Sequence, residues 1–231
     1  MKNIVIATVK SWNLANAEIL KQKLAGEYVV TIISDKQQLT SERLADLDPE
    51  YAFFPHWSWI IPEEIYSTFN CVVFHMTDLP FGRGGSPLQN LIARGIYETK
   101  ISAIKVVKDL DAGDVYLKKD LNIEFGSAEE IFSRASKVIF TEMIPAILKD
   151  KPHPKIQKGE IVKFSRRKPE QSELFTANLN SSKKVYDYIR MLDAEGYPKA
   201  YIMLNSIKIE FSGAQFHNGR LTGRFEVINE E

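Results

Sequence analysis

The sequence predicts an α/β protein with a mostly parallel sheet and a small C-terminal α+β appendage. Up to about residue 125, short β-branched runs alternate with helical patterns. The strand-like runs, such as NIVIATV and CVVFHMT, are apolar on both faces, which indicates a sheet covered by helices on two sides. The first strand-to-helix turn, TVKSWNLAN, contains no glycine, so a dinucleotide-binding fingerprint is absent and a nicotinamide or flavin enzyme is disfavoured.

The elements follow in chain order. Strands are expected at residues 3–9, 28–34, 51–56, 71–77, 100–107 and 114–123, with helices at 12–24, 41–47 and 62–69. A long amphipathic helix is predicted next, at 126–148. Ser127 is a suitable N-cap and Glu130 completes a capping box, while Ile131, Ala135, Ile139 and Met143 recur on one face.

These patterns predict three parts: a domain at 1–150, a basic connector at 151–180 and a helix-plus-hairpin subdomain at 181–231. Residues 149–168 hold eight Lys or Arg and two acids. They form either a solvated linker or a groove for an anionic substrate, made by Lys163, Arg166 and Arg167. In the tail, a helix at 181–196 precedes strands at 201–205, 207–212 and 220–228, and Asn218-Gly219 marks a hairpin turn.

Composition and charge exclude several classes of protein. Thirty basic and thirty acidic side chains cancel, so the chain lacks the charge excess typical of nucleic-acid binders. One cysteine, Cys71, rules out an internal disulfide framework and a cysteine-rich zinc site. No signal peptide or membrane-spanning run is recognisable, so a cytoplasmic location is expected.

The chemistry is expected around His75, which ends an apolar strand in VVFHMTDLPFGRGG. Taken alone, such a histidine is more often structural. Asp109, Asp111 and Asp114 lie between two later strands, and an acid that orients a histidine is a general-base arrangement. No serine lies in a G-x-S-x-G turn and Cys71 is expected to be buried, so no protein nucleophile is evident.

A metal site is the alternative to this general-base arrangement. His56, His75 and Asp111 could in principle form a facial triad. Their spacing does not support it, so no metal is predicted.

A family resemblance rests on several linked positions. His75, Thr77, Leu79 and Pro80, followed by Arg83-Gly84 and Pro87, resemble the H-x-S-L-L-P…R-G…P signature of the formyltransferases that use 10-formyltetrahydrofolate. Thirty-six residues after His75, LDAGD supplies Asp111 at the separation of the family's active-site aspartate. The resemblance implies a Rossmann-like formyltransferase domain, 10-formyltetrahydrofolate as co-substrate, and His75 and Asp111 as catalytic residues.

The sequence departs from this family at Val73, where the family has an asparagine that donates a hydrogen bond to the oxyanion. Losing one such donor costs about 2–4 kcal/mol unless another group replaces it. Protonated His75, Ser58, Thr77, His56 or a water could do so. Otherwise catalysis is weak or absent.

The resemblance also locates the binding segments. The pterin is expected against FPHWSWIIP and KDLDAGD. Residues expected to bind the cofactor are Trp57, Ser58, Trp59, Ile60, Asp109, Leu110 and Asp114. Residues expected to bind the acceptor are Lys10, Ser11, Trp12, Asn13, Thr77, Arg83, Gly84, Arg166 and Arg167. Ser11 has an alternative role as the cap of its helix.

The acceptor predicted from these features is a nucleotide-linked amino-deoxy sugar. Transfer RNA members of the family are longer and basic, and ribonucleotide members carry a glycine-rich phosphate turn that is missing here. The Val73 departure resembles the pseudaminic-acid branch, whose acceptor is a UDP-linked 4-amino-4,6-dideoxy sugar. The alternatives are a methionyl-tRNA formyltransferase and a non-catalytic folate- or sugar-binding paralogue. No nucleic-acid or membrane partner is expected, and the hairpin could pair two chains in a homodimer.

Overall fold

The computed structural model describes residues 1–229, which form two compact units made from discontinuous segments. The first unit comprises Met1–Arg83, Lys100–Leu121 and Ser133–Lys163, and the second comprises Gly84–Thr99, Asn122–Phe132 and the chain from Phe164 onward. The predicted division into three consecutive parts differs from these spatial units because two segments of the second unit precede residue 133.

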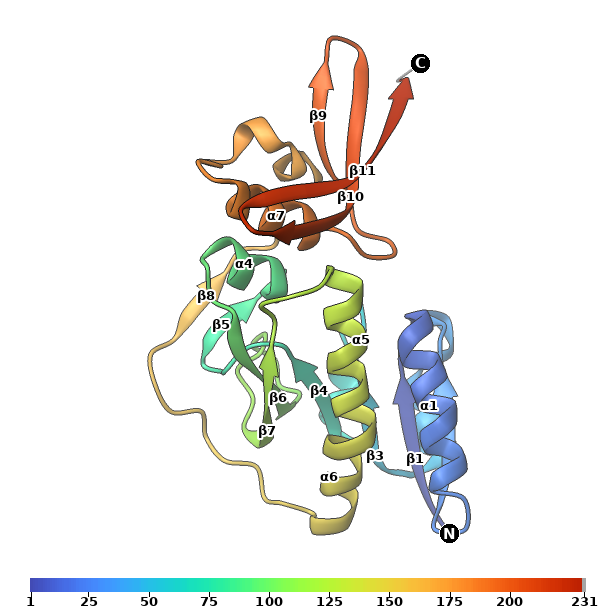
Figure 1. The fold of residues 1–231 in the computed structure, drawn as a ribbon. Helices are drawn as coiled ribbons and strands as arrows, with labels where there is room; N and C mark the ends of the chain where they lie inside the picture. Colours follow the sequence, from blue (N-terminus) through green and yellow to red (C-terminus); the bar gives the residue numbers. More distant parts are fainter. Residues whose placement is uncertain (230–231) are drawn as a thin grey trace. The chain divides into compact units, whose positions relative to one another are not determined.

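A six-stranded sheet in the order β2-β1-β3-β4-β6-β7 confirms the predicted α/β class (Figure 1). β1 (Lys2–Ala7), β2 (Tyr28–Ile33), β3 (Pro49–Phe54) and β4 (Cys71–His75) are parallel, whereas β6 (Glu98–Lys105) runs antiparallel to β4. β7 (Val115–Asn122) lies at the edge. The carboxyl ends of β1, β3 and β4 therefore meet at one edge, where parallel sheets keep their ligands.

Helices cover the sheet because its central strands are apolar on both sides. Ile4, Val5, Ile6 and Ala7 are all fully buried, although alternate side chains of a strand point to opposite faces. α1 (Ser11–Lys23) lies beside β1 in Figure 1. The remaining short helices of this region are η1 (Lys36–Gln38), α2 (Ser41–Leu47) and α3 (Glu63–Tyr66).

The long amphipathic helix is present as α5 (Ala128–Val138), a π-helical turn η2 (Ile139–Met143) and α6 (Ile144–Asp150). Its capping box is confirmed, since Glu130 N donates to Ser127 Oγ at 3.2 Å and Ser127 N donates to Glu130 Oε2 at 2.8 Å. The π-helical turn was not predicted. Pro145 explains it, because proline has no N–H to donate and its ring clashes with the carbonyl four residues earlier.

The second unit contains α4 (Pro87–Ala93), α7 (Ser182–Arg190) and a three-stranded sheet of β9 (Ala200–Leu204), β10 (Ile207–His217) and β11 (Arg220–Asn229). Two short 3-10 helices, η3 (Pro169–Ser172) and η4 (Leu174–Thr176), precede α7. Asn218 and Gly219 have φ of 50° and 76°, so the predicted tight hairpin turn is confirmed. Pairing of this hairpin across a dimer axis stays a prediction.

Two strands were not expected from the sequence: β5 (Phe81–Gly84) and β8 (Val162–Phe164), which form a two-stranded sheet. They are too short for a period-two pattern to identify. Gly84 has φ of +110°, and a Cβ there would lie 2.3 Å from the Phe164 carbonyl oxygen, so only glycine fits. Within residues 1–229, no helix is long and apolar enough to cross a membrane.

Candidate active site

The histidine singled out by the sequence ends β4 and is buried, with 8% of its surface exposed. Cys71, Val73 and His75 share one face of β4 because side chains alternate along a strand. Cys71 and Val73 pack in an apolar cluster on that face. The beginning of β4 therefore lies in an apolar core, and its last residue places the imidazole at the edge where the parallel strands end.

Both ring nitrogens of His75 face oxygen atoms. Nε2 lies 2.8 Å from the Gly82 carbonyl oxygen, and Nδ1 lies 3.5 Å from Asp111 Oδ1. A carbonyl oxygen can only accept, so Nε2 carries the proton in this contact. The predicted pairing of His75 with Asp111 is thus present in the structure.

The turn after β4 is fixed by the buried Ser102 of β6. Its hydroxyl donates to the Thr77 carbonyl at 2.7 Å and accepts from Leu79 N at 3.4 Å. Thr77 Oγ1 in turn donates to the Gly82 carbonyl at 3.4 Å. The Thr77 hydroxyl, proposed above as a replacement oxyanion donor, is therefore engaged with the oxygen that His75 also contacts.

Asp111 reaches His75 by an indirect route. β6 runs antiparallel to β4, with Ser102 opposite His75 and Lys105 opposite Val72, so the chain leaves β6 near the beginning of β4. The following loop must fold back to bring Asp111 to the imidazole. Asp111 has φ of +54°, a conformation that non-glycine residues seldom adopt.

The glycine of the LDAGD motif, Gly113, is required by a close approach to β6. A Cβ at this position would lie 1.7 Å from the carbonyl oxygen of Lys105, so a larger residue would push the loop away from β6. Lys105 N also donates to the Asp114 carbonyl at 2.9 Å. Asp114, which was predicted to bind the cofactor, thus uses its backbone to close this loop onto β6.

Arg83 was predicted to bind an anion, and its guanidinium is paired within the protein. Nε and Nη2 donate to Gln157 Oε1 at 3.0 and 2.8 Å. Gln157 Nε2 donates to the carbonyls of Asp111 and Gly113, both at 2.8 Å. Sequence reasoning missed Gln157, because nothing separates it from the surrounding polar connector residues.

An apolar cluster beside β4 explains why a valine suits position 73. Val73, Trp57 and Val106 pack against buried residues that include Phe54 and Cys71. Phe54 lies opposite Val73 in the register of β3 and β4. Cys71, as expected, is buried, and burial raises the pKa of its thiol to about 12, so it stays protonated and is a poor nucleophile.

The predicted cofactor segments present apolar surface beside this cluster. Trp59, Ile60 and Leu110 are 39%, 89% and 69% exposed, which is unusual for such large apolar side chains. Trp57 packs edge-on against Trp59, with ring centroids 4.9 Å apart. The Trp57 indole N–H is buried and has no hydrogen-bond partner among the described residues. Ser58 and Asp109 are exposed.

The first turn of α1 brings together several of the predicted acceptor residues. Trp12 lies edge-on to His56 at 5.9 Å, and Lys10 Nζ lies 5.8 Å from the Trp12 ring. Burial, together with the nearby Lys10, lowers the pKa of His56 to about 4, so this imidazole is neutral near pH 7. Asn13 is buried and donates to the Pro55 carbonyl at 3.3 Å.

Ser11 does not cap α1. The N-cap is Lys10, and no side-chain hydrogen bond caps the helix. Among the described residues, no cluster of His, Cys, Asp and Glu could hold a metal ion, so His56, His75 and Asp111 do not form the facial triad considered above.

The remaining predicted acceptor residues, Gly84, Arg166 and Arg167, belong to the second unit. Arg167 lies over the Tyr188 ring and donates to the Tyr188 hydroxyl at 2.8 Å and to the Gln171 carbonyl. Gly85 packs against the backbone and Cβ of Arg166, where a Cβ on the glycine would lie 2.5 Å from the arginine Cβ. These contacts stabilise the unit internally.

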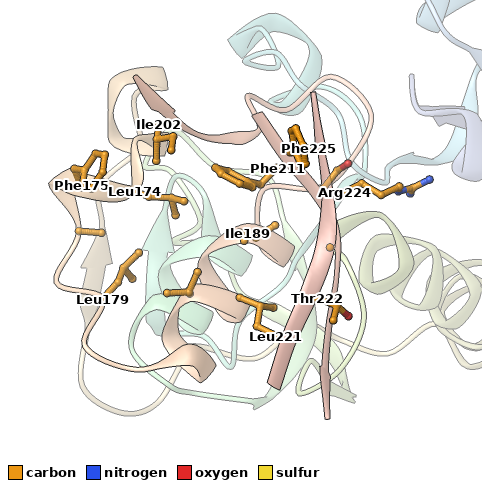
Figure 2. Close-up of a pocket in the computed structure, with 14 residues that line it drawn as sticks. Leu174, Phe175, Leu179, Ile189, Ile202, Phe211, Leu221, Thr222, Arg224 and Phe225 are labelled. Carbon is orange, nitrogen blue, oxygen red and sulfur yellow. The ribbon is translucent and has the colours of Figure 1, made fainter. Parts of the chain in front are cut away.

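An apolar groove of about 550 Å³ also lies within the second unit (Figure 2). Leu174, Leu179, Ile189, Phe211 and Leu221 point into it from η4, α7, β10, β11 and the segment before α7. Histidine and acidic side chains are missing from the described lining, so the groove offers no acid–base chemistry.

Comparison with known proteins settles the family. A model for "Methionyl-tRNA formyltransferase, C-terminal domain" matches residues 169–228. The methionyl-tRNA formyltransferase of Bacillus cytotoxicus is 30% identical over 176 residues, which cover 73% of this chain and 55% of that protein. The solved methionyl-tRNA formyltransferase from Clostridium thermocellum is 55% identical, with a TM-score of 0.96 and complete coverage of both chains. The chain belongs to the formyltransferase family.

A sugar N-formyltransferase from Shewanella is far more distant. It is 13% identical, with a TM-score of 0.71 and coverage of 97% of this chain and 96% of that one, which shows a shared fold alone. The chain spans about half the length of the curated relatives it matches.

The predicted nucleotide-sugar acceptor, and with it the pseudaminic-acid assignment, is wrong. The 55% identical relative is a methionyl-tRNA formyltransferase, and the family model matches residues 169–228 of a chain that was expected to be too short for this class. The expectation of a small-molecule partner and no nucleic acid fails for the same reason. Net charge was a poor guide because salt screens charges beyond about 10 Å, so groups close to a bound phosphate, and not the sum over the chain, decide phosphate binding.

Proposed function

We propose that this protein transfers a formyl group from 10-formyltetrahydrofolate to the amine of methionine carried on initiator tRNA. The observation that carries the proposal is the 55% identity, over the full length of both chains, with the Clostridium thermocellum protein of that name. The family model on residues 169–228 supports the same acceptor.

The catalytic roles proposed here belong to His75 and Asp111. The folate supplies the formyl carbon, to which the amine nitrogen bonds as the bond to the folate nitrogen breaks. The attacking amine loses a proton, and the departing folate nitrogen takes one up as its bond to the formyl carbon breaks. Because Nε2 of His75 already donates its proton to the Gly82 carbonyl, Nδ1 is the ring nitrogen that can accept and return this proton, and the Asp111 carboxylate 3.5 Å away stabilises the positive charge on the ring.

The first unit also has features suited to the folate. The exposed Trp59, Ile60 and Leu110 offer an apolar surface for a flat pterin ring. The buried indole N–H of Trp57, without a partner among the described residues, suits an oxygen or nitrogen acceptor on the ligand.

We further propose that the parts divide the work, with catalysis in residues 1–150, a connector at 151–180 and acceptor contacts from 181–231. A reaction on charged tRNA also makes the cytoplasm the predicted compartment.

A direct assay tests the proposed reaction. The chain is mixed with 10-formyltetrahydrofolate and methionyl initiator tRNA, and formylmethionyl-tRNA is measured beside released tetrahydrofolate. Equal amounts of both products are expected, and free methionine is the control acceptor. Binding of the tRNA should weaken steeply with salt, because phosphate contacts release counterions. Tetrahydrofolate release that does not depend on tRNA, or no release at low salt, contradicts the proposal.

Val73 favours one second candidate, a paralogue that binds without turnover. The Val73→Asn variant separates the two, with Val73→Thr as a control of similar volume to valine. If another donor already serves the oxyanion, asparagine brings no gain in rate and costs about 1–3 kcal/mol of stability, because an amide enters an apolar cluster. A large gain in rate over an inactive parent chain identifies a decayed site.

A further inference from the structure

The side chain of Gln157 makes four hydrogen bonds at the candidate active site. Its Oε1 accepts two from the Arg83 guanidinium, at 3.0 and 2.8 Å, and its Nε2 donates two, to the Asp111 and Gly113 carbonyls. An uncharged carboxamide with both donors and the acceptor engaged is fixed in one orientation.

One half of this carboxamide holds the loop that carries the catalytic aspartate. Because β6 runs antiparallel to β4, this loop has to return along the sheet, and Asp111 adopts a positive φ within it. The two Gln157 hydrogen bonds end on the backbone of Asp111 itself and of the glycine two residues later. They offset part of the cost of this unusual backbone conformation.

The other half reaches the opposite side of His75. Arg83 directly follows Gly82, whose carbonyl lies 2.8 Å from His75 Nε2. The paired guanidinium restrains the backbone beside this carbonyl. Gln157 therefore joins, through one planar group, the two elements that contact the two ring nitrogens of His75.

We infer that Gln157 is a positioning residue that sets the geometry of the His75–Asp111 pair. Gln157 does not touch the reacting atoms in this assignment, since it acts through the backbone of Asp111 and through Arg83. The kinetic consequence rests on the proposed function. The consequence for the His75 ring does not.

Two variants, with side chains of nearly the same size as glutamine, test the contributions of the two ends of the carboxamide. Gln157→Glu keeps an acceptor for Arg83 and removes both donors to the loop, and Gln157→Leu removes both halves. Lys158→Ala, at the exposed neighbouring position, is the matched control. We expect both Gln157 variants to lower kcat by about 10–100-fold, because misplacing a catalytic group by an ångström has effects of this size. KM for the folate should change less than threefold, roughly, since uniform substrate binding is not the property that is lost.

A spectroscopic measurement separates positioning from simple structural support. The ¹⁵N chemical shifts of the His75 ring report which nitrogen carries the proton, and His75→Gln identifies its signals among the four histidines. In both Gln157 variants the His75 signals should move while the His56 and His217 signals and the melting temperature stay near those of the parent. Unchanged His75 shifts together with a kcat near that of the parent overturn the inference.

The same experiment distinguishes failure of the inference from failure of the proposed reaction. If the parent chain forms no formylmethionyl-tRNA, the function is wrong, and the His75 shifts still test the position of the loop. If the parent chain is active and Gln157→Glu retains full kcat, the donors to the Asp111 loop are not needed and the positioning role is excluded. A loss of kcat that only accompanies global unfolding also counts against it, because Lys158→Ala and the melting curves expose that outcome.

Discussion

The two units each contain a buried pairing of a basic side chain with an aspartate, and the two are built differently. In the first unit, His75 Nδ1 lies 3.5 Å from Asp111 Oδ1, and the aspartate sits on a folded-back loop with a positive φ. In the second, Arg190 Nε lies 2.7 Å from Asp187 Oδ1, one helical turn away on α7.

The surroundings sharpen the contrast. Arg190 is 1% exposed and also donates to the carbonyls of Ile123 and Gly126, while the Tyr97 hydroxyl donates to Asp187 Oδ2 at 2.7 Å. This pair is close and local in sequence, and most of its polar atoms make hydrogen bonds, although Arg190 Nη2 has no partner among the described residues. The His75 pair is looser and depends on groups distant in sequence. The difference shows that the Arg190 pair is a compact ion pair within one helix, whereas the His75 pair is an imidazole held by groups from distant segments, as its proposed catalytic role requires.

The largest effect is expected when the His75–Asp111 pair of the first unit is broken. His75→Ala and Asp111→Ala should each lower formyl transfer by about 10³-fold, since acid–base groups contribute effects of this size. His75→Ala should also lower the unfolding free energy by about 1–3 kcal/mol, because it removes a buried ring and leaves the Gly82 carbonyl without its donor. Single-turnover rates and urea unfolding check the two halves of this expectation. A small effect on rate at both positions would mean that the site is misplaced.

The next effect breaks the pair in the second unit. Arg190→Met should cost about 3 kcal/mol of unfolding free energy, because it leaves the Asp187 carboxylate buried without its principal partner. Lys184→Met, on the exposed side of the same helix, should stay within about 0.5 kcal/mol. Urea denaturation measures both. Adding Asp187→Leu to Arg190→Met should recover part of the loss. If the double variant is less stable than the single one, the carboxylate is not the cause.

The smallest effect concerns Tyr97, which links the same aspartate to its surroundings. Burial, and then the hydrogen bond to Asp187, raise the pKa of Tyr97 to about 12, while Lys183 and Arg190 face its ring at 4.8 and 5.9 Å. The folded protein holds this proton more tightly than the unfolded chain, whose tyrosine pKa is about 10. The stabilisation is present below pH 10 and is lost as pH rises toward 12.

Tyr97→Phe should therefore flatten the fall in stability between pH 10 and 12 and change stability little near pH 7, by about 1 kcal/mol for one lost hydrogen bond. Thermal melts across that range, beside the parent chain, test this. An identical alkaline slope in both proteins would show that Tyr97 does not contribute.

The features that the sequence alone determined are local ones. The capping box of Ser127 and Glu130, the Asn218-Gly219 turn and the buried stripe from Ile131 to Met143 each depend on residues within a few turns of chain. The spacing of the family signature also predicts that His75 lies beside Asp111, and the two side chains are 3.5 Å apart in the structure. Such patterns are readable because hydrogen bonding and burial act there over short separations.

The contacts between segments that are distant in the sequence were decided by the tertiary structure. Only the antiparallel register of β4 and β6 determines that the Asp111 loop must fold back, and only packing brings Gln157 to it across 46 residues of chain. The acceptor class was predicted wrongly because net charge sums over the whole chain, whereas recognition depends on a local surface. Short-range patterns in the sequence therefore predict the helices, the turns and the candidate site residues. The contacts that hold these residues in place are decided by the fold, because contacts between distant residues produce no periodic pattern in the sequence.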